Sequence, residues 1–175
     1  DDGIKIRNGL MVELGLTQAP GAWNASQDGI GEYLHWTGLI HGTLSRMATD
    51  IETMGRTAIG EVQEGEGAGE SSTMPHKTNP RASNMLQTYA RLGRMYCSGA
   101  LDLMDQVDVR AASMRATAWT ILPEASMVLS AALERAKTLV ANLVVHDQRM
   151  LENFSNSRQF IMSESVMMRL AKAVG

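Results

Sequence analysis

The stretch IGEYLHWTGLIHGTLSRMATDIETM, residues 30–54, decides the fold class of this 175-residue chain. One series of its residues recurs at alternating steps of three and four: Ile30, Tyr33, Thr37, Ile40, Leu44, Met47, Ile51 and Met54. This spacing places the series on one side of an α-helix. Gly31, Gly38 and Gly42 each weaken an isolated helix by ~1 kcal/mol relative to Ala. We therefore expect close packing against other helices to compensate.

Two later series follow the same spacing and predict two more long helices. The first comes after Pro80 and comprises Met85, Tyr89, Leu92, Tyr96, Gly99 and Leu103. The second comprises Leu129, Ala132, Ala136, Leu139, Leu143, His146 and Met150. A helix over residues 121–153 would extend ~50 Å at 1.5 Å per residue, which predicts an elongated antiparallel bundle or an oligomer. Between the two series, residues 105–120 are less regular.

Shorter patterns complete the prediction. Residues 4–14 form a weakly amphipathic helix that Gly15 closes, and residues 17–21 form a loop. Residues 153–157 are predicted as a break, and residues 164–174 as the start of another helix. Since the chain lacks an initial Met and a helical pattern continues to its end, we expect a fragment of a longer protein.

Composition supports an all-α fold and narrows the function classes. Aromatic residues make up 5% of the chain, Pro occurs four times, and Met occurs 13 times beside many Ala and Leu residues. The net charge is −3, from 16 Lys+Arg and 19 Asp+Glu, and basic residues do not cluster, so we expect neither a nucleic-acid nor a membrane partner. Apolar runs are far shorter than the ~18 residues of a membrane span. The single cysteine, Cys97, leaves no intrachain disulfide and predicts a cytoplasmic protein.

Residues 55–80 interrupt every helical period with Gly, Pro and Glu. A loop of this length inside a compact domain is uncommon and indicates either a mobile functional lid or a disordered linker. Its last part, GESSTMPHKTNP (residues 69–80), combines hydroxyls, the Lys77 ammonium and the Asn79 amide at a helix start. Free backbone N–H groups after Pro80 would add to an anion site, which predicts a carboxylate-bearing substrate. The alternative is that these residues only cap the helix while Lys77 is solvated.

The order of these residues resembles the signature of the fumarase/aspartase superfamily, G-S-S-x-M-P-x-K-x-N-P. MPHK, residues 74–77, is more similar to its 3-carboxy-cis,cis-muconate cycloisomerase and adenylosuccinate lyase branch than to fumarase. The resemblance extends over nearly the whole chain, with further similar segments at residues 13–16, 42–44, 50–51, 122–124 and 161–168.

The resemblance implies an enzyme that removes a proton next to a carboxylate of a polycarboxylate and cleaves a C–O or C–N bond, without an organic cofactor. It assigns the role of the base to Ser71 and makes Lys77 and Asn79 ligands of the substrate carboxylate. Ser72 and Met74 would be loop residues around the substrate, and Arg110 would bind substrate as part of a His-Glu-Arg element. A serine is a weak base, so Ser71 would need its alkoxide stabilised inside a closed site. The resemblance also implies a homotetramer whose active sites each combine residues of three subunits. Residues 1–154 would belong to the central bundle domain, with loop 55–80 carrying the signature, and residues 155–175 would begin a C-terminal helical domain.

The chain departs from the pattern at several positions. Glu70 replaces the Gly before the base, and its negative charge would make Ser71 harder to ionise. Thr78 and Gln27 each replace an Arg, and residues 108–109 (Asp-Val) replace His-Glu. These departures leave two alternatives open, namely an adenylosuccinate lyase and a noncatalytic helical assembly protein. The family's His-bearing segment, with the expected general acid, would lie upstream of this chain.

The histidines do not indicate a metal site. His76 lies in the signature, at a position that varies within the family. His35, His41 and His146 stand singly on predicted helices, without the second His or acidic pair that metal spacing requires. We therefore predict no metal.

Overall fold

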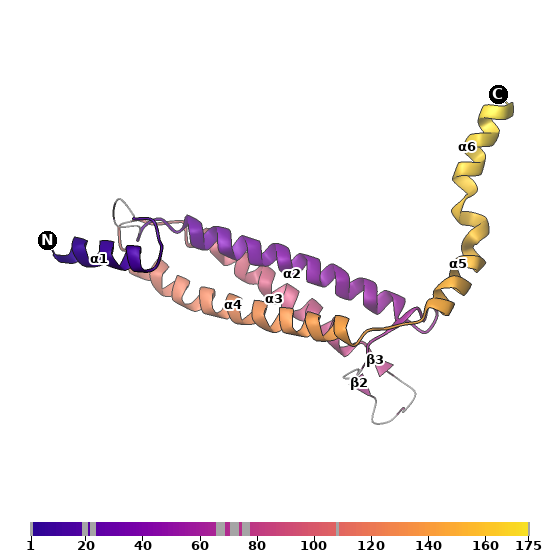
Figure 1. Ribbon diagram of the computed structural model, residues 1–175, viewed down its shortest axis with the longest axis horizontal. Helices are drawn as coiled ribbons and strands as arrows, with labels where there is room; N and C mark the ends of the chain where they lie inside the picture. The colour runs from indigo at the N-terminus through magenta and orange to yellow at the C-terminus, as the bar shows by residue number, and fades with distance from the viewer. Residues whose placement is uncertain are drawn as a thin grey trace.

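The computed structural model describes residues 2–18, 21, 24–65, 69–70, 74, 78–107 and 109–174 (Figure 1). The helices are α1 (Asp2–Glu13), α2 (Asp28–Met54), α3 (Arg81–Asp102), α4 (Ala112–Ala141), α5 (Asp147–Ile161) and α6 (Ser163–Val174). Two-residue strands lie in the connections: β1 (Val62–Gln63), β2 (Gly69–Glu70), β3 (Thr78–Asn79) and β4 (Val144–Val145). The strands form two antiparallel pairs, β1 with β4 and β2 with β3. The all-α class is confirmed.

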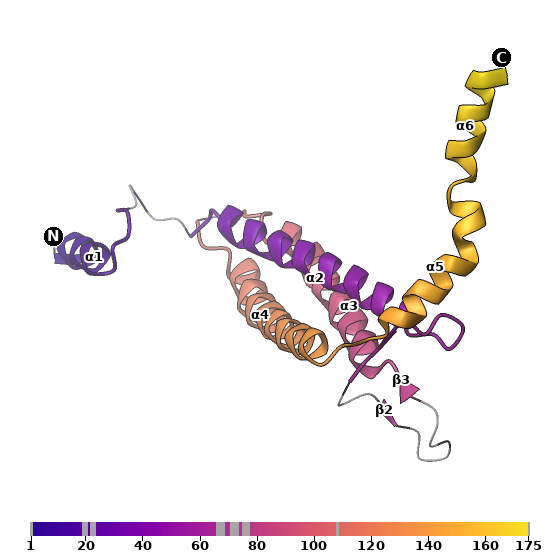
Figure 2. The same cartoon turned by 45° about the vertical axis from the view of Figure 1, so that its right-hand side comes forward.

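Helices α2, α3 and α4 lie side by side along their lengths and form the expected elongated bundle (Figure 1). Helix α4 has 30 residues and is therefore ~45 Å long at 1.5 Å per residue. Helix α1 lies beyond one end of the bundle, and α5 and α6 leave the opposite end as an arm (Figure 2). The hairpin of β2 and β3 lies at the same end as α5.

Half of the residues in the buried core are alanines. The core forms two clusters along the bundle, one with Ala48, Ile51, Val62, Leu86, Ala132, Ala136 and Leu139, and one with Leu34, Ala100, Leu103, Ala118 and Ala125. Side chains of this size let the helix axes approach closely. At Gly93 the approach is so close that an added Cβ would overlap the His41 ring. Of the glycines for which close packing was expected, Gly38 shows it, because an added Cβ would overlap the Cys97 sulfur, whereas nothing lies within 4 Å of a Cβ added at Gly42.

On α2 and α3 the buried face lies slightly to one side of the predicted series, whereas on α4 the predicted residues Leu129, Ala132, Ala136 and Leu139 are themselves buried. On α2 the fully buried residues are Gly31, Leu34, Thr37, His41, Ala48 and Ile51. On α3 they are Ser83, Leu86, Ala90, Gly93 and Ala100. Most of the large residues in the predicted series are only half-buried. The reason is that small residues occupy the line of closest approach, and large ones flank it.

Three predicted boundaries in the second half were wrong. Residues 112–120 are helical, because Ala118 joins the core and begins the packed side of α4. The long helix ends at Ala141 rather than near residue 153, because β4 pairs with β1 directly afterwards. Residues 153–157 are no break, since α5 continues through them. The helices predicted over residues 4–14 and 164–174 are confirmed as α1 and α6, with bounds that differ by one or two residues, and Gly15 has a φ of 65° as a left-handed cap requires.

Among the described residues, α4 is the one helix long and apolar enough to cross a membrane by length and composition alone. In this chain 22% of its most apolar window is buried. The buried side packs on α3 and α2, so we interpret α4 as a bundle helix with an exposed apolar outer side.

Candidate functional site

The signature segment is carried by a hairpin. Strand β2 pairs with β3 in the register Gly69↔Asn79 and Glu70↔Thr78, so the two ends of segment 71–77 are joined. The predicted base Ser71, its neighbour Ser72 and the ligand Lys77 lie outside the described residues, as does the side chain of Glu70. Met74 is 42% exposed, and Asn79 is half-buried beside the start of α3. Of the predicted loop residues, the structure therefore places Met74 and Asn79.

Residues 55–65, which lead to the hairpin, are structured, whereas the linker alternative predicted disorder over residues 55–80. After α2, Gly60 adopts a φ of 66° and closes a turn, and β1 then pairs with β4. Next to β1, the backbone of Gly65 packs so closely on Asn142, at the end of α4, that a Cβ would overlap the Asn142 carbonyl oxygen. Residues 55–65 are thus fixed against the end of the bundle.

The start of α3 is occupied by a carboxylate of the chain itself. The backbone N–H of Ser83 donates to Glu64 Oε1 at 2.8 Å, and that of Ala82 donates to Glu64 Oε2 at 2.9 Å. Glu64 is only 7% exposed. The expectation of free N–H groups for a substrate at this position was therefore wrong for Ala82 and Ser83, since Glu64 already satisfies these donors. Sequence reasoning missed Glu64, although an acidic residue beside the loop was a visible signal.

A first cavity, of about 360 Å³, lies at the base of the hairpin. Asn79 lines it together with Thr78 and Glu64 from the hairpin side. Glu52 and Arg56 line it from the end of α2, where Gln87 Nε2 donates to Glu52 Oε2 at 2.7 Å. The cavity thus brings the predicted ligand Asn79 next to an arginine that the sequence analysis did not select.

A second cavity, of about 720 Å³, lies between the start of α2 and the start of α4. It is lined by the predicted ligand Arg110 and by Arg115, whose guanidinium lies 5.4 Å from the ring centroid of Trp119. Gln27 also lines it, and its Oε1 is buried without a hydrogen-bond partner in the described structure. Two guanidinium groups and an unpaired amide oxygen suit a ligand that carries carboxylates and a hydrogen-bond donor.

The two cavities cannot form one site within a single chain. Asn79 lies two residues before the start of α3, and Arg110 lies eight residues after its end. With 22 residues, α3 separates them by ~33 Å at 1.5 Å per residue. The structure therefore does not bring the predicted site residues Asn79 and Arg110 together in one copy.

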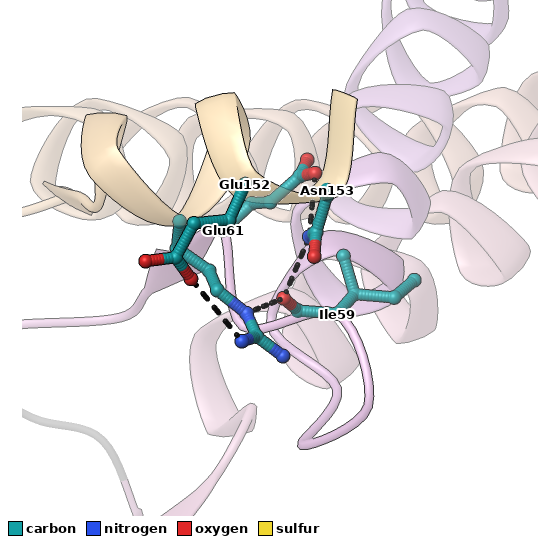
Figure 3. A network of polar contacts seen from close by, with 5 residues as sticks. Ile59, Glu61, Glu152 and Asn153 are labelled. Atoms are coloured by element: carbon teal, nitrogen blue, oxygen red, sulfur yellow. Dashed lines mark hydrogen bonds and ion pairs between the residues drawn. The ribbon is translucent and has the colours of Figure 1, made fainter. Parts of the chain in front are cut away.

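A polar network fastens the hairpin end of the bundle to α5 (Figure 3). Asn153 Nδ2 donates to the Ile59 carbonyl at 3.0 Å and to Glu61 Oε1 at 2.9 Å. Arg149 Nε donates to the same carbonyl at 3.0 Å, and Arg149 Nη1 lies 3.5 Å from Glu152 Oε2. The turn that leads to β1 is thus held by the first turns of α5.

No group of three or more His, Cys, Asp or Glu that could hold a metal ion occurs in the part of the chain that the structure describes.

Comparison with known proteins supports the resemblance found in the sequence. A lyase family model matches residues 6–92. The 3-carboxy-cis,cis-muconate cycloisomerase of Pseudomonas aeruginosa is 32% identical over 100% of this chain and 39% of its own length. Trans-aconitate decarboxylase 1 of Mycosarcoma maydis is 35% identical over 100% of this chain and 36% of its own length. The crystal structure of the 3-carboxy-cis,cis-muconate lactonizing enzyme from Pseudomonas putida superimposes with a TM-score of 0.83 at 30% identity, covering 95% of this chain and 38% of that one. The chain thus spans less than two fifths of the length of these relatives.

Proposed function

Because this chain belongs to the lyase family of the fumarase/aspartase superfamily, we propose that it is part of an enzyme that removes a proton next to a carboxylate of a polycarboxylate and cleaves a C–O or C–N bond. Within this class the proposed activity is most like that of 3-carboxy-cis,cis-muconate cycloisomerase. The observation that carries the proposal is the segment GESSTMPHKTNP, whose ends are joined by β2 and β3 beside a cavity. The relatives' names refer to 3-carboxy-cis,cis-muconate and trans-aconitate, and both compounds carry several carboxylates.

The proposed roles follow from the charge that the reaction develops. Abstraction of a proton next to a carboxylate leaves an aci-carboxylate with additional negative charge. In the proposal Ser71 takes the proton, Lys77 and Asn79 bind the charged carboxylate, and Ser72 and Met74 shape the loop around it. Since Glu64 already occupies the Ala82 and Ser83 N–H groups, Lys77 and Arg56, which lines the cavity, would supply the positive charge at this end.

Arg110 completes the proposed site from a second copy. The ~33 Å length of α3 keeps Arg110 away from the hairpin of its own chain, so a substrate that contacts both requires a hairpin from another subunit. Exposed apolar side chains on the bundle support burial against other copies, among them Trp36, Leu39, Met95, Trp119 and Met127. We propose a homotetramer with shared sites, no organic cofactor and a cytoplasmic location.

The arm also supports the proposed division of the chain. Helices α5 and α6 leave the bundle and carry exposed apolar residues, including Phe154, Met162 and Val166. We propose that residues 1–154 belong to the central bundle domain, because Arg149 and Asn153 in the first turns of α5 still contact the turn before β1, and that residues 155–175 begin a C-terminal helical domain.

The test is the full-length protein and its Ser71→Ala variant, assayed with 3-carboxy-cis,cis-muconate. We expect turnover by the unmodified protein and a loss of kcat of at least about 100-fold in the variant, because a general base contributes about 10²–10⁴-fold. Unchanged circular dichroism and oligomeric state would serve as the control for folding. Cleavage of adenylosuccinate instead, followed by the purine absorbance, would favour the adenylosuccinate lyase alternative. No turnover of either compound by the unmodified protein, with an assembly that Ser71→Ala leaves unchanged, would favour a noncatalytic assembly protein.

A further inference from the structure

The carboxylate of Glu64 closes the loop region from outside the signature. It lies five residues before β2 and binds two consecutive backbone N–H groups at the start of α3, at 2.8 and 2.9 Å. The contact therefore joins the two ends of the chain segment 65–81, which contains the β2–β3 pair. The contact is nearly dry, because Glu64 is 7% exposed and Ser83 is fully buried.

Helix α3 offers no other cap of its own in the structure. Its N-cap residue, Pro80, makes no side-chain cap hydrogen bond, and the first turn contains no acidic residue. A carboxylate at this position satisfies two N–H groups that the helix leaves open and favours the positive end of the helix dipole. The direction in which the chain enters α3 thus depends on Glu64.

That entry is where the predicted ligand Asn79 stands. Asn79 lies three residues before Ala82, and it lines the 360 Å³ cavity together with Glu64. A shift at the start of α3 is passed through Pro80, whose φ is fixed by its ring, to Asn79 and from there through β3 to β2. We therefore expect Asn79 and the β2–β3 pair to shift when this contact is lost.

We propose that Glu64 is a positioning residue, whose carboxylate clamps the start of α3 and so holds Asn79 and the β2–β3 pair in the orientation that the reaction needs. The inference rests on the proposed function. Glu64 does not contact the reacting atoms in this role. It acts through Asn79 and the β2–β3 pair.

The experiment uses full-length protein with the variants Glu64→Ala and Glu64→Gln. Peptide-level hydrogen exchange over residues 78–86 reports the clamp, and kcat and KM for 3-carboxy-cis,cis-muconate report its consequence. In Glu64→Ala we expect exchange of this peptide to quicken by about tenfold, because two hydrogen bonds are lost, and kcat to fall by at least about tenfold, because misplaced catalytic groups are costly. KM should change less than kcat. Glu64→Gln keeps one acceptor oxygen and should be intermediate in both measurements.

Glu61→Gln is the matched control. It removes the same charge three residues away, and its amide oxygen still accepts from Asn153, so exchange over residues 78–86 and kcat should remain at the unmodified values. A merely structural role for Glu64 would lower the thermal midpoint but leave kcat unchanged where the variant is fully folded. That result, or unchanged exchange in Glu64→Ala, would overturn the proposal. If the unmodified protein does not turn over this compound, the proposed function fails, and the exchange result alone then decides whether the clamp exists.

Discussion

His41 lies at the contact between α2 and α3 with 1% of its surface exposed. Neither ring nitrogen has a hydrogen-bond partner among the described residues, and the ring covers the position where Gly93 has no side chain. Burial lowers the pKa of His41 below its ordinary value of 6.5, and the nearby positive charge of Arg94 lowers it further. The neutral form is therefore the one that fits the folded protein.

This lowered pKa predicts that stability falls in mild acid. Above pH 6.5 the side chain is neutral in both states and its contribution is fully present. As the pH falls through 6.5 the unfolded chain binds a proton that the folded chain still excludes, so stability is lost until the folded pKa is reached. One such group gives a slope of up to about 1.4 kcal/mol per pH unit.

The thermal midpoint of the full-length protein, measured from pH 8 to 5, checks this prediction. His41→Leu should flatten the decline below pH 6.5, whereas His35→Gln should retain it, because His35 is exposed on the other side of α2. An unchanged decline in His41→Leu would show that other groups cause it.

At the scale of the elements, the network of Figure 3 is a joint between α5 and the turn before β1. Asn153→Ala removes the amide donor to the Ile59 carbonyl and to Glu61. We expect a destabilisation of about 1–2 kcal/mol, because a net hydrogen bond contributes about 1 kcal/mol and the site is partly exposed. Hydrogen exchange should increase over residues 55–63 and remain unchanged within α3.

The matched control for this joint is Ser157→Ala. The Ser157 hydroxyl donates only to carbonyls of its own helix, those of Asn153 and Phe154, so its loss should leave residues 55–63 protected. Equal exchange in the two variants would contradict the assignment of Asn153 as the joint.

The helices were predictable from sequence because large residues at steps of three and four mark a helix side even when they only flank the contact. On α2 and α3 the line of closest approach was not predictable, since it runs through Ala48 and Gly93, which carry little hydrophobic signal. Two-residue strands such as β1 and β4 are too short to give a periodic signal. Because the pairing of β4 with β1 ends α4 at Ala141, the sequence-based prediction placed the end of this helix too far along the chain. The signature residues were found by their order, whereas Glu64 was missed because its partners are backbone N–H groups 18 and 19 residues away.

The whole molecule presents its two candidate half-sites at opposite ends of one bundle. The hairpin with Asn79 lies at one end, and the cavity with Arg110 and Arg115 lies between α2 and α4 at the other. Two copies that run antiparallel would place the hairpin of one beside the arginines of the other. The exposed apolar sides of the bundle supply surface for such a contact.

This arrangement predicts that two inactive variants restore activity when mixed. Ser71→Ala damages the hairpin half and Arg110→Ala damages the arginine half, so each homo-oligomer is expected to be inactive. In a randomly reassembled 1:1 mixture, about 50% of the subunits carry an intact hairpin and the rest carry an intact Arg110. A site that draws these two parts from different subunits of a symmetric assembly therefore has both intact in about a quarter of cases. Co-expression with two affinity tags, followed by purification through both tags, isolates the mixed oligomers for the assay.

The double variant Ser71→Ala/Arg110→Ala, co-expressed with the unmodified chain, is the control for dilution of subunits. A site there again needs both halves intact, so activity should also be about a quarter of the unmodified value. If each site were instead built within one chain, the mixture of single variants would stay inactive while this control retained half of the activity. The two mixtures thus separate a shared site from a single-chain site, because the ~33 Å length of α3 permits recovery only when the hairpin and Arg110 come from different copies.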